Sequence, residues 1–294
     1  MAASGGAATA CRRFCEDRDV PTLQSMTSRP PSHAALRQVG HGLVELLLVS
    51  GLYVVYKLGR LLAANHADAA RAHARLVHHL ERVLHLPSEA AIQQAVHSVR
   101  LLEAANVYYV SAHFPVTIAF LVWGFVARPR AEYLWARRLL MVVTLLGLVA
   151  HILFPLAPPR MFPHWGFLDT MTTYGPSAYD GASGALVNQY AAMPSLHIGW
   201  AVLVAVVVCR TGPRWLATLA CLHALTTVAV VIVTANHWLL DGVVAVALLG
   251  VALLVVPRPT TARPAEPARA ERYQPGSTSA AQTSSGPTTT TITL

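Results

Sequence analysis

The expected architecture of this chain follows from the stretch TANHWLLDGVVAVALLGVALLVV (residues 234–256). From Gly242 to Val256 the stretch carries no charged or polar side chain, whereas His237 and Asp241 stand near its start. A helix needs about 20 apolar residues to cross the hydrocarbon core of a bilayer. We therefore predict a membrane-spanning helix over 237–256 with ionisable side chains at one end.

Five further apolar stretches have a comparable length, at residues 41–63, 104–127, 138–156, 195–210 and 215–234. Apolar residues make up 54% of the chain and charged residues 12%, which is about half of the charged share in a soluble domain. The mean hydropathy is +0.46. This composition excludes a disordered chain, a collagen and a small disulfide-stapled domain. The sequence predicts an all-α integral membrane bundle of six helices.

The segments that flank these stretches have a different composition. Residues 1–36 are polar and rich in Ala, Ser and Pro, and residues 257–294 are rich in Pro, Thr and Ser. Segments with few apolar residues cannot bury enough surface to fold. We therefore expect two disordered tails on either side of a membrane domain at 37–256.

An amphipathic segment is expected at 66–103, before the second span. In RAHARLVHHLERVLHL (71–86) apolar side chains recur at helical spacing between Arg, His and Glu. They form a stripe of Leu76, Leu80, Val83 and Leu84. Pro87 would end this helix, and Ser88 would cap the next one. We expect a pair of helices on the membrane surface, with a cytosolic helical hairpin as the alternative.

Arginine gathers in the loops on one side of the predicted bundle. The loops 128–138 and 210–214 and the tail after residue 256 are rich in Arg, whereas Arg160 is the single cation between the third and fourth spans. Cytoplasmic loops carry an excess of Lys and Arg. We therefore expect a multi-pass protein of the cell membrane with both termini in the cytoplasm. These loops also account for the net charge of +8, so nucleic acid is not an expected partner.

Three polar clusters fall at the other, outer ends of the spans. Arg160 follows the third span in APPRM. Ser195 and His197 open the fourth span, and His237 and Asp241 open the sixth. The six-span topology brings these three ends to one face of the membrane. Because ionisable groups are costly in a membrane, a functional site is the default interpretation.

The residue types in these clusters suit a phosphate group. A helix that begins near Ser195 would present uncommitted N–H groups to an anion, and Arg160 would add a fork of charged donors. His237 and Asp241 are four residues apart and would share a helix face, so the carboxylate would fix the imidazole tautomer. His197 could then protonate a leaving group. These are the parts of a phosphoryl-transfer site that needs no metal and no cofactor.

Metal chemistry finds no support in the sequence. No H-E-x-x-H motif is present, and the four cysteines show no zinc-ligand spacing. We interpret the cysteines as free thiols.

A further polar stripe lies on the second span. Asn106, Tyr109 and His113 fall at i, i+3 and i+7, which places them on one side of a helix. They could line a pocket for a lipid headgroup, or they could form hydrogen bonds between helices. The sequence leaves both alternatives open.

The motifs PSLH (194–197) and NHWLLD (236–241) resemble the type-2 phosphatidic acid phosphatase superfamily. The longer pattern resembles its branch of inositol phosphorylceramide synthases and their bacterial relatives. That pattern reads FPLAPPRMFP…GFLDTM…NQYAAMPSLHIGW…TANHWLLD, with ERVLHLP and NVYYVSAHFPVT upstream. The resemblance covers about residues 75–256 and implies a six-helix membrane bundle with a covalent phosphohistidine mechanism.

The resemblance also implies a role for each residue of the polar clusters. His237 would be the nucleophile, Asp241 would orient it, and His197 would be the general acid. Arg160 and Ser195 would bind the phosphate.

The chain departs from the superfamily pattern at two cationic positions. Leu153 stands where the first motif usually has Lys, and Val231 stands where the last motif usually begins with Ser-Arg. In addition, Met161 follows Arg160 in place of the usual Pro. A dianionic monoester would be held less strongly by Arg160 alone, whereas a singly charged diester needs less positive charge. The missing cations therefore favour phosphodiester transfer.

The expected function is a membrane lipid phosphotransferase that acts on a lipid phosphodiester at the outer face. Its substrate would be a membrane lipid, and a lipid or another alcohol would accept the phosphoryl group; the resemblance suggests inositol phosphate as the group transferred. One alternative is a lipid phosphate monoesterase that acts on polyprenyl or diacylglycerol phosphates. Another alternative is a non-catalytic protein that binds an anionic lipid.

Overall fold

The computed structural model describes residues 66–177 and 189–259, with isolated positions between 40 and 54. The described residues form helices joined by loops and contain no strand. The predicted first span, 41–63, and both predicted tails fall largely outside these ranges. The helices are α2 (Ala67–Val83), α3 (Glu89–Gln94), α4 (Val99–Ser111), α5 (His113–Ala127), α6 (Arg130–Leu153), α7 (Thr170–Tyr174), α9 (Leu196–Thr211), α10 (Arg214–Val233) and α11 (Leu239–Val255).

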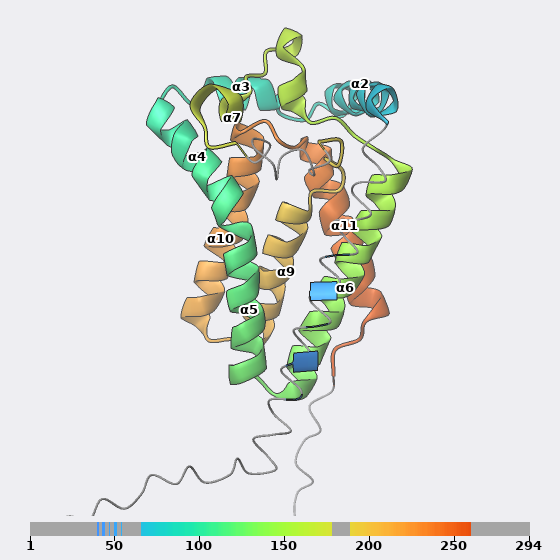
Figure 1. Cartoon of the computed structure of the whole chain (residues 1–294), viewed down its shortest axis with the longest axis vertical. Coiled ribbons are helices and arrows are strands. Elements are labelled where there is room, and N and C mark those ends of the chain that lie inside the picture. The colour runs from blue at the N-terminus through green and yellow to red at the C-terminus, as the bar shows by residue number, and fades with distance from the viewer. Residues whose placement is uncertain are drawn as a thin grey trace, which may run out of the picture.

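The longer helices of the chain after α2 run along the long axis of a bundle, and short helices lie at one end of it (Figure 1). α4 and α5 follow one another, and α6, α9, α10 and α11 complete the bundle. α9 packs against α5, α6, α10 and α11, and its side chains Leu203, Val204 and Val207 are buried in the core. α2, α3 and α7 lie at the end where α9 and α11 begin.

The membrane-spanning character differs between the helices. α6 and α10 are each long and apolar enough to cross a membrane, and α4 and α5 together form a third candidate that bends by 47°. Pro115 has no N–H to donate to the carbonyl of Ser111, which accounts for the bend at this position. α9 and α11 are apolar but shorter. The all-helical membrane fold is thus supported, whereas the count of six spans stays a prediction.

The outer surface of the bundle is suited to lipid. Large apolar side chains are exposed on outward faces, for example Leu145 on α6, Leu225 on α10 and Leu254 on α11. Lipid tails can cover such side chains without the cost of exposing them to water.

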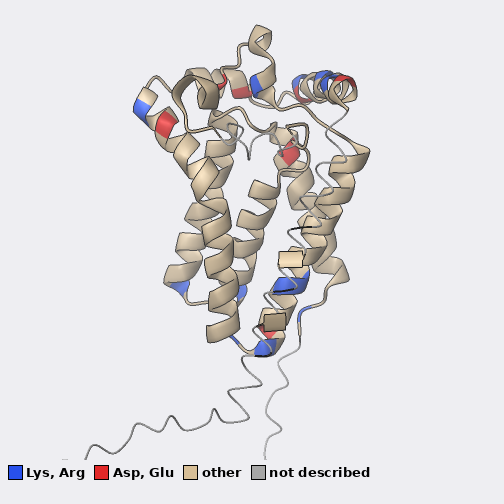
Figure 2. Ribbon diagram, in the orientation of Figure 1, with Lys and Arg blue, Asp and Glu red and all other residues tan. Residues whose placement is uncertain are grey.

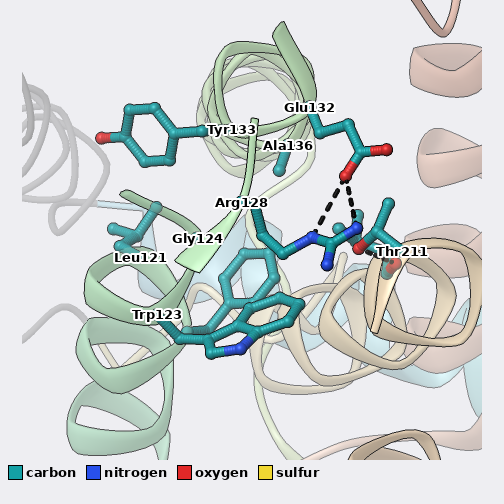
Figure 3. A pocket seen from close by; sticks show the side chains of 10 residues that line it. Leu121, Trp123, Gly124, Arg128, Glu132, Tyr133, Ala136 and Thr211 are labelled. Atoms are coloured by element: carbon teal, nitrogen blue, oxygen red, sulfur yellow. Dashed lines mark hydrogen bonds and ion pairs between the residues drawn. The ribbon is translucent and has the colours of Figure 1, made fainter. Parts of the chain in front are cut away.

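The predicted arginine-rich loops meet at the end opposite to α2 and α3 (Figure 2). Arg128 forms an ion pair with Glu132 at 2.8 Å. Arg258 lies 3.9 Å from Glu132 and donates a hydrogen bond to the Arg210 carbonyl. The Arg128–Glu132 pair borders a small, largely apolar pocket that is also lined by Trp123 (Figure 3). The structure therefore brings these three segments together, although most of the predicted loop 128–138 belongs to α6. Their cytoplasmic location stays a prediction.

The predicted amphipathic segment forms α2 and α3. One face of α2 is buried through Ala70, Ala74 and Val77. The predicted stripe points elsewhere, because Leu76 and Leu84 are 49% and 58% exposed. Such an exposed apolar stripe suits a helix at a membrane surface, and this location stays a prediction.

The boundaries of the segment differ in part from the expectation. The Ser88 hydroxyl accepts a hydrogen bond from the Ala91 N–H, which confirms the predicted cap of α3. α3 ends at Gln94, however, and α4 begins at Val99 with Ser98 as its cap. The span that we expected to begin at 104 therefore begins earlier, because the cap at Ser98 starts a new helix.

Candidate active site

His237 lies in a turn between two helices. α10 ends at Val233 and α11 begins at Leu239, with Trp238 as the N-terminal cap position. Our expectation that His237 and Asp241 share a helix face is therefore wrong. They meet because the Asp241 carboxylate turns back to accept the Trp238 N–H at 2.9 Å, which brings it next to His237.

The ring of His237 is held by one of its two nitrogens. Nδ1 lies 2.9 Å from the Ala192 carbonyl and 3.2 Å from Asp241 Oδ2. Both partners are acceptors, so the hydrogen bonds assign the proton to Nδ1 and leave a lone pair on Nε2. Nε2 is buried and has no hydrogen-bond partner among the described residues. This is the arrangement expected of a nucleophilic imidazole.

His197 lies beside His237, as the sequence predicted. Their ring centroids are 5.7 Å apart. The His197 ring also contacts Tyr109 and His113, each with a centroid distance of 4.4 Å. Two aromatic rings from the α4–α5 span thus restrict the orientation of the expected general acid.

Close helix packing fixes the first turn of α9, which carries His197, relative to α6 and α11. A Cβ added to Gly147 on α6 would lie 2.7 Å from the Leu196 side chain, and one added to Gly242 on α11 would lie 2.8 Å from Ile198. The two glycines therefore allow the first turn of α9 to approach both neighbouring helices.

Ser195 caps α9 and connects it to α11. Its hydroxyl oxygen accepts the Ile198 N–H at 3.4 Å. Its own N–H donates to the Asp241 carbonyl at 3.1 Å, so the expectation that this N–H is uncommitted is wrong. The cap uses the hydroxyl oxygen as an acceptor, which leaves the hydroxyl hydrogen as the group that Ser195 could offer to a phosphate.

Arg160 lies at the turn that carries His237. Its backbone N–H donates to the Ala235 carbonyl at 2.9 Å. Its guanidinium is buried and donates to Asn236 through Nε and to Gln189 through Nη2. Nη1 forms an ion pair with Asp169 at 3.3 Å. The positive charge at the site is therefore paired with a carboxylate.

The sequence analysis did not single out Asp169, Gln189 or Asn236. All three lie in the quoted runs GFLDTM, NQYAAM and TANHW, close to predicted site residues. Their convergence on one guanidinium depends on tertiary contacts, so local spacing gave no signal for it.

A family model with the description PAP2 superfamily matches residues 75–255. The chain belongs to the PAP2 superfamily. Membership supports, at a coarse level, a membrane enzyme of the phosphatase or phosphotransferase type that acts on lipid phosphates. No curated protein and no solved structure matches the chain. The branch of inositol phosphorylceramide synthases stays a prediction.

The two positions that depart from the usual PAP2 motifs have different surroundings. Leu153 is 75% exposed at the end of α6, whereas Val231 is fully buried in α10. The Val231 carbonyl accepts the N–H groups of Asn236 and His237. Val231 thus supports the backbone of the turn that carries His237.

The predicted polar stripe of α4 and α5 divides into two environments. Asn106 is fully buried, and its amide group donates to the carbonyls of Thr170 and Gly175 and accepts from the Thr170 hydroxyl. These bonds correspond to the alternative of hydrogen bonding between elements. Tyr109 and His113 instead lie against His197, on the side where His197 and His237 meet.

Two further buried side chains hold the loops around the candidate site. Nε2 of His151 lies 3.0 Å from the Pro194 carbonyl and so connects α6 to the PSLH motif. The indole N–H of Trp238 donates to the Ala157 carbonyl at 3.0 Å. Within the part of the chain that the structure describes, no three His, Cys, Asp or Glu side chains are grouped as metal ligands.

Proposed function

We propose that this chain is a membrane lipid phosphotransferase that acts on a phosphodiester through a phosphohistidine at His237. The observation that carries the proposal is the state of the His237 ring. Nδ1 is held by Ala192 and Asp241, while Nε2 is buried and unpartnered. A base of known tautomer with one uncommitted lone pair beside a second histidine suits nucleophilic attack on phosphorus.

The proposed reaction has two steps. In the first, Nε2 of His237 attacks phosphorus, the bond from phosphorus to the leaving alcohol breaks, and His197 donates a proton to the departing oxygen. In the second, His197 takes the proton from an acceptor alcohol or water, whose oxygen attacks phosphorus and breaks the P–N bond. The Asp241 carboxylate stabilises the positive charge of His237 in the intermediate.

The charge at the site supports a diester over a monoester. Arg160 is paired with Asp169 at 3.3 Å, and neutral residues occupy the two positions where the superfamily usually has cations, Leu153 and Val231. A dianion gains more than a monoanion from net positive charge. The site therefore suits a singly charged phosphodiester, and an inositol phosphate is the first headgroup to test because of the branch that the chain resembles.

The location of the site follows from the proposed orientation in the membrane. The arginine-rich loops and the site occupy opposite ends of the bundle. With these loops and both termini in the cytoplasm, the site would act at the outer face of the cell membrane.

The experiment that tests the proposal is the mass of an adduct on His237. Purified protein is mixed with total membrane lipid, quenched without acid and digested. A phosphoryl group that still carries a polar headgroup is the expected result, and its mass identifies the headgroup. A bare phosphoryl group would indicate a monoesterase, and bound lipid without any adduct would indicate the non-catalytic alternative.

Two variants make the adduct assay specific. His237→Ala should abolish both the adduct and turnover while the protein still inserts and folds. His223→Asn is the matched control, because His223 is a half-buried histidine of α10 that bonds to Tyr108. The His223→Asn variant should retain the adduct. Turnover in the His237→Ala variant would refute the mechanism.

A further inference from the structure

Two buried glutamates outside the predicted site hold the first turn of α11. Glu81, in the last turn of α2, accepts the Leu240 N–H at 2.9 Å. Glu89, the first residue of α3, accepts the Leu239 N–H at 2.9 Å. Each glutamate is only 3% exposed. The segment that we expect at the membrane surface is thus bonded directly to the helix that carries Asp241.

These contacts complete the N-terminus of α11. The first N–H groups of a helix have no partner within the helix, and they favour a nearby negative charge. Here the N–H groups of Trp238, Leu239 and Leu240 all donate to carboxyl oxygens, the first of them to Asp241. The turn that joins His237 to α11 is therefore fixed on both sides, by Asp241 from within and by α2 and α3 from outside.

We propose that Glu81 and Glu89 are positioning residues for the nucleophile. They hold the first turn of α11 in place, so that Asp241 keeps the His237 ring in its reactive orientation. They act through the α11 backbone. The inference rests on the proposed function of His237.

The protonation state of Glu81 beside Glu89 makes Glu81→Gln the conservative substitution. Burial raises the pKa of the Glu81 carboxyl to about 9, and the carboxylates of Glu89 and Asp241 add to the rise. At neutral pH Glu81 therefore carries a proton and can donate to Glu89 while its other oxygen accepts the Leu240 N–H. A glutamine at this position offers the same acceptor and a comparable donor.

The test compares two substitutions of Glu81 in the full chain. The readouts are the maximal rate of adduct formation on His237 with total membrane lipid, per folded protein, and the lipid concentration at half-maximal rate. Glu81→Leu should lower the maximal rate at least tenfold and leave the half-saturating concentration within twofold. Glu81→Gln should stay within threefold of the parent rate. Hydrogen exchange of the Leu239 and Leu240 amides should be faster in Glu81→Leu alone.

A matched control separates positioning from loss of a buried glutamate. Glu132→Leu removes a buried glutamate at the opposite end of the bundle, where it pairs with Arg128, and should retain the parent rate. If Glu81→Leu does not fold, the double variant Glu81→Gln/Glu89→Gln replaces it. This variant places two amide NH₂ groups against each other and should lose at least tenfold in rate, whereas each single glutamine variant remains active.

The outcomes distinguish this inference from the proposed function. A parent rate in Glu81→Leu, or an equal loss in Glu81→Gln, would overturn the positioning role while the parent adduct still supports the function. If the parent forms no adduct at all, the proposed function fails and the positioning role fails with it.

Discussion

Replacement of Asp169 by Asn should shift the site from phosphodiesters towards phosphomonoesters. Oδ2 of Asp169 lies 3.3 Å from Arg160 Nη1 and so offsets the charge of the arginine that we expect to bind the phosphate. Oδ1 accepts the Thr172 N–H and caps α7. Because Asn caps a helix about as well as Asp, the substitution removes the charge and retains α7.

The magnitude follows from Coulomb's law. A phosphate oxygen bound to the same guanidinium would lie about 6 Å from the Asp169 carboxylate, given hydrogen bonds of about 3 Å on either side. With an effective dielectric constant of about 20, one unit charge at this distance is worth about 3 kcal/mol. The repulsion from Asp169 is about twice as large for a dianionic phosphate as for a monoanionic one. Since Asp169 is partly exposed, solvent reduces the difference, and we expect the monoester-to-diester ratio of kcat/KM to rise about tenfold.

The assay measures kcat/KM with phosphatidic acid as the monoester and phosphatidylinositol as the diester, both in mixed micelles. Gln189→Ala is the control, because Gln189 also accepts from the Arg160 guanidinium but carries no charge. It should leave the ratio within twofold of the parent. An unchanged ratio in Asp169→Asn, or an equal shift in both variants, would refute the electrostatic reasoning.

Three further predictions concern other parts of the site. Asp241→Asn should slow adduct formation on His237 by about a hundredfold or more, because the neutral amide no longer stabilises the charged ring; a single-turnover rate close to the parent would contradict this. Asn106→Ala should lower the free energy of unfolding by about 2–4 kcal/mol through the loss of three hydrogen bonds, two of them buried. Denaturant unfolding in detergent measures this loss, and unchanged stability with an altered headgroup preference would instead favour a headgroup pocket. The pKa of Glu81 rises from 4.5 to about 9 on folding, so folded protein binds this proton more tightly than unfolded protein. The contribution of Glu81 to stability is therefore present at low pH and lost as the pH rises from about 4.5 to about 9. Unfolding midpoints across this range should fall less steeply in Glu81→Gln than in the parent, and identical slopes would exclude Glu81 as the source.

The sequence predicted that the site residues converge, because successive helices of a bundle run in opposite directions and every second loop lies at the same end. The apolar lengths predicted the helices, and the order of the spans then placed the ends near Arg160, His197 and His237 together. The structure confirms that the helix ends near these residues lie at one end of the bundle, where the rings of His197 and His237 are 5.7 Å apart. This part of the site required no knowledge of individual side-chain contacts.

The sequence could not predict contacts that depend on partners far along the chain. Glu81 and Glu89 bond to residues 159 and 150 positions away, so no local periodicity relates them to α11. The i, i+4 spacing of His237 and Asp241 correctly predicted that the two residues pair. The prediction that both lie on one helix was wrong. In the sequence the apolar run continues across Trp238, so the start of the helix is not marked. In the structure the Asp241 carboxylate accepts the Trp238 N–H, and α11 begins after Trp238.

The two helix N-termini at this end of the bundle serve different purposes. At α11 the N–H groups of Trp238, Leu239 and Leu240 all donate to carboxyl oxygens, those of Asp241, Glu89 and Glu81. The positive end of this helix dipole is therefore already occupied by buried carboxyl groups. We expect a phosphate on Nε2 of His237 to depend on Arg160 and on the first turn of α9. Because the guanidinium is itself paired with a carboxylate, the net attraction for a second negative charge on the phosphate is weak. The proposed preference for a diester thus rests on the distribution of charge around both helices as well as on the absence of two cations from the motifs.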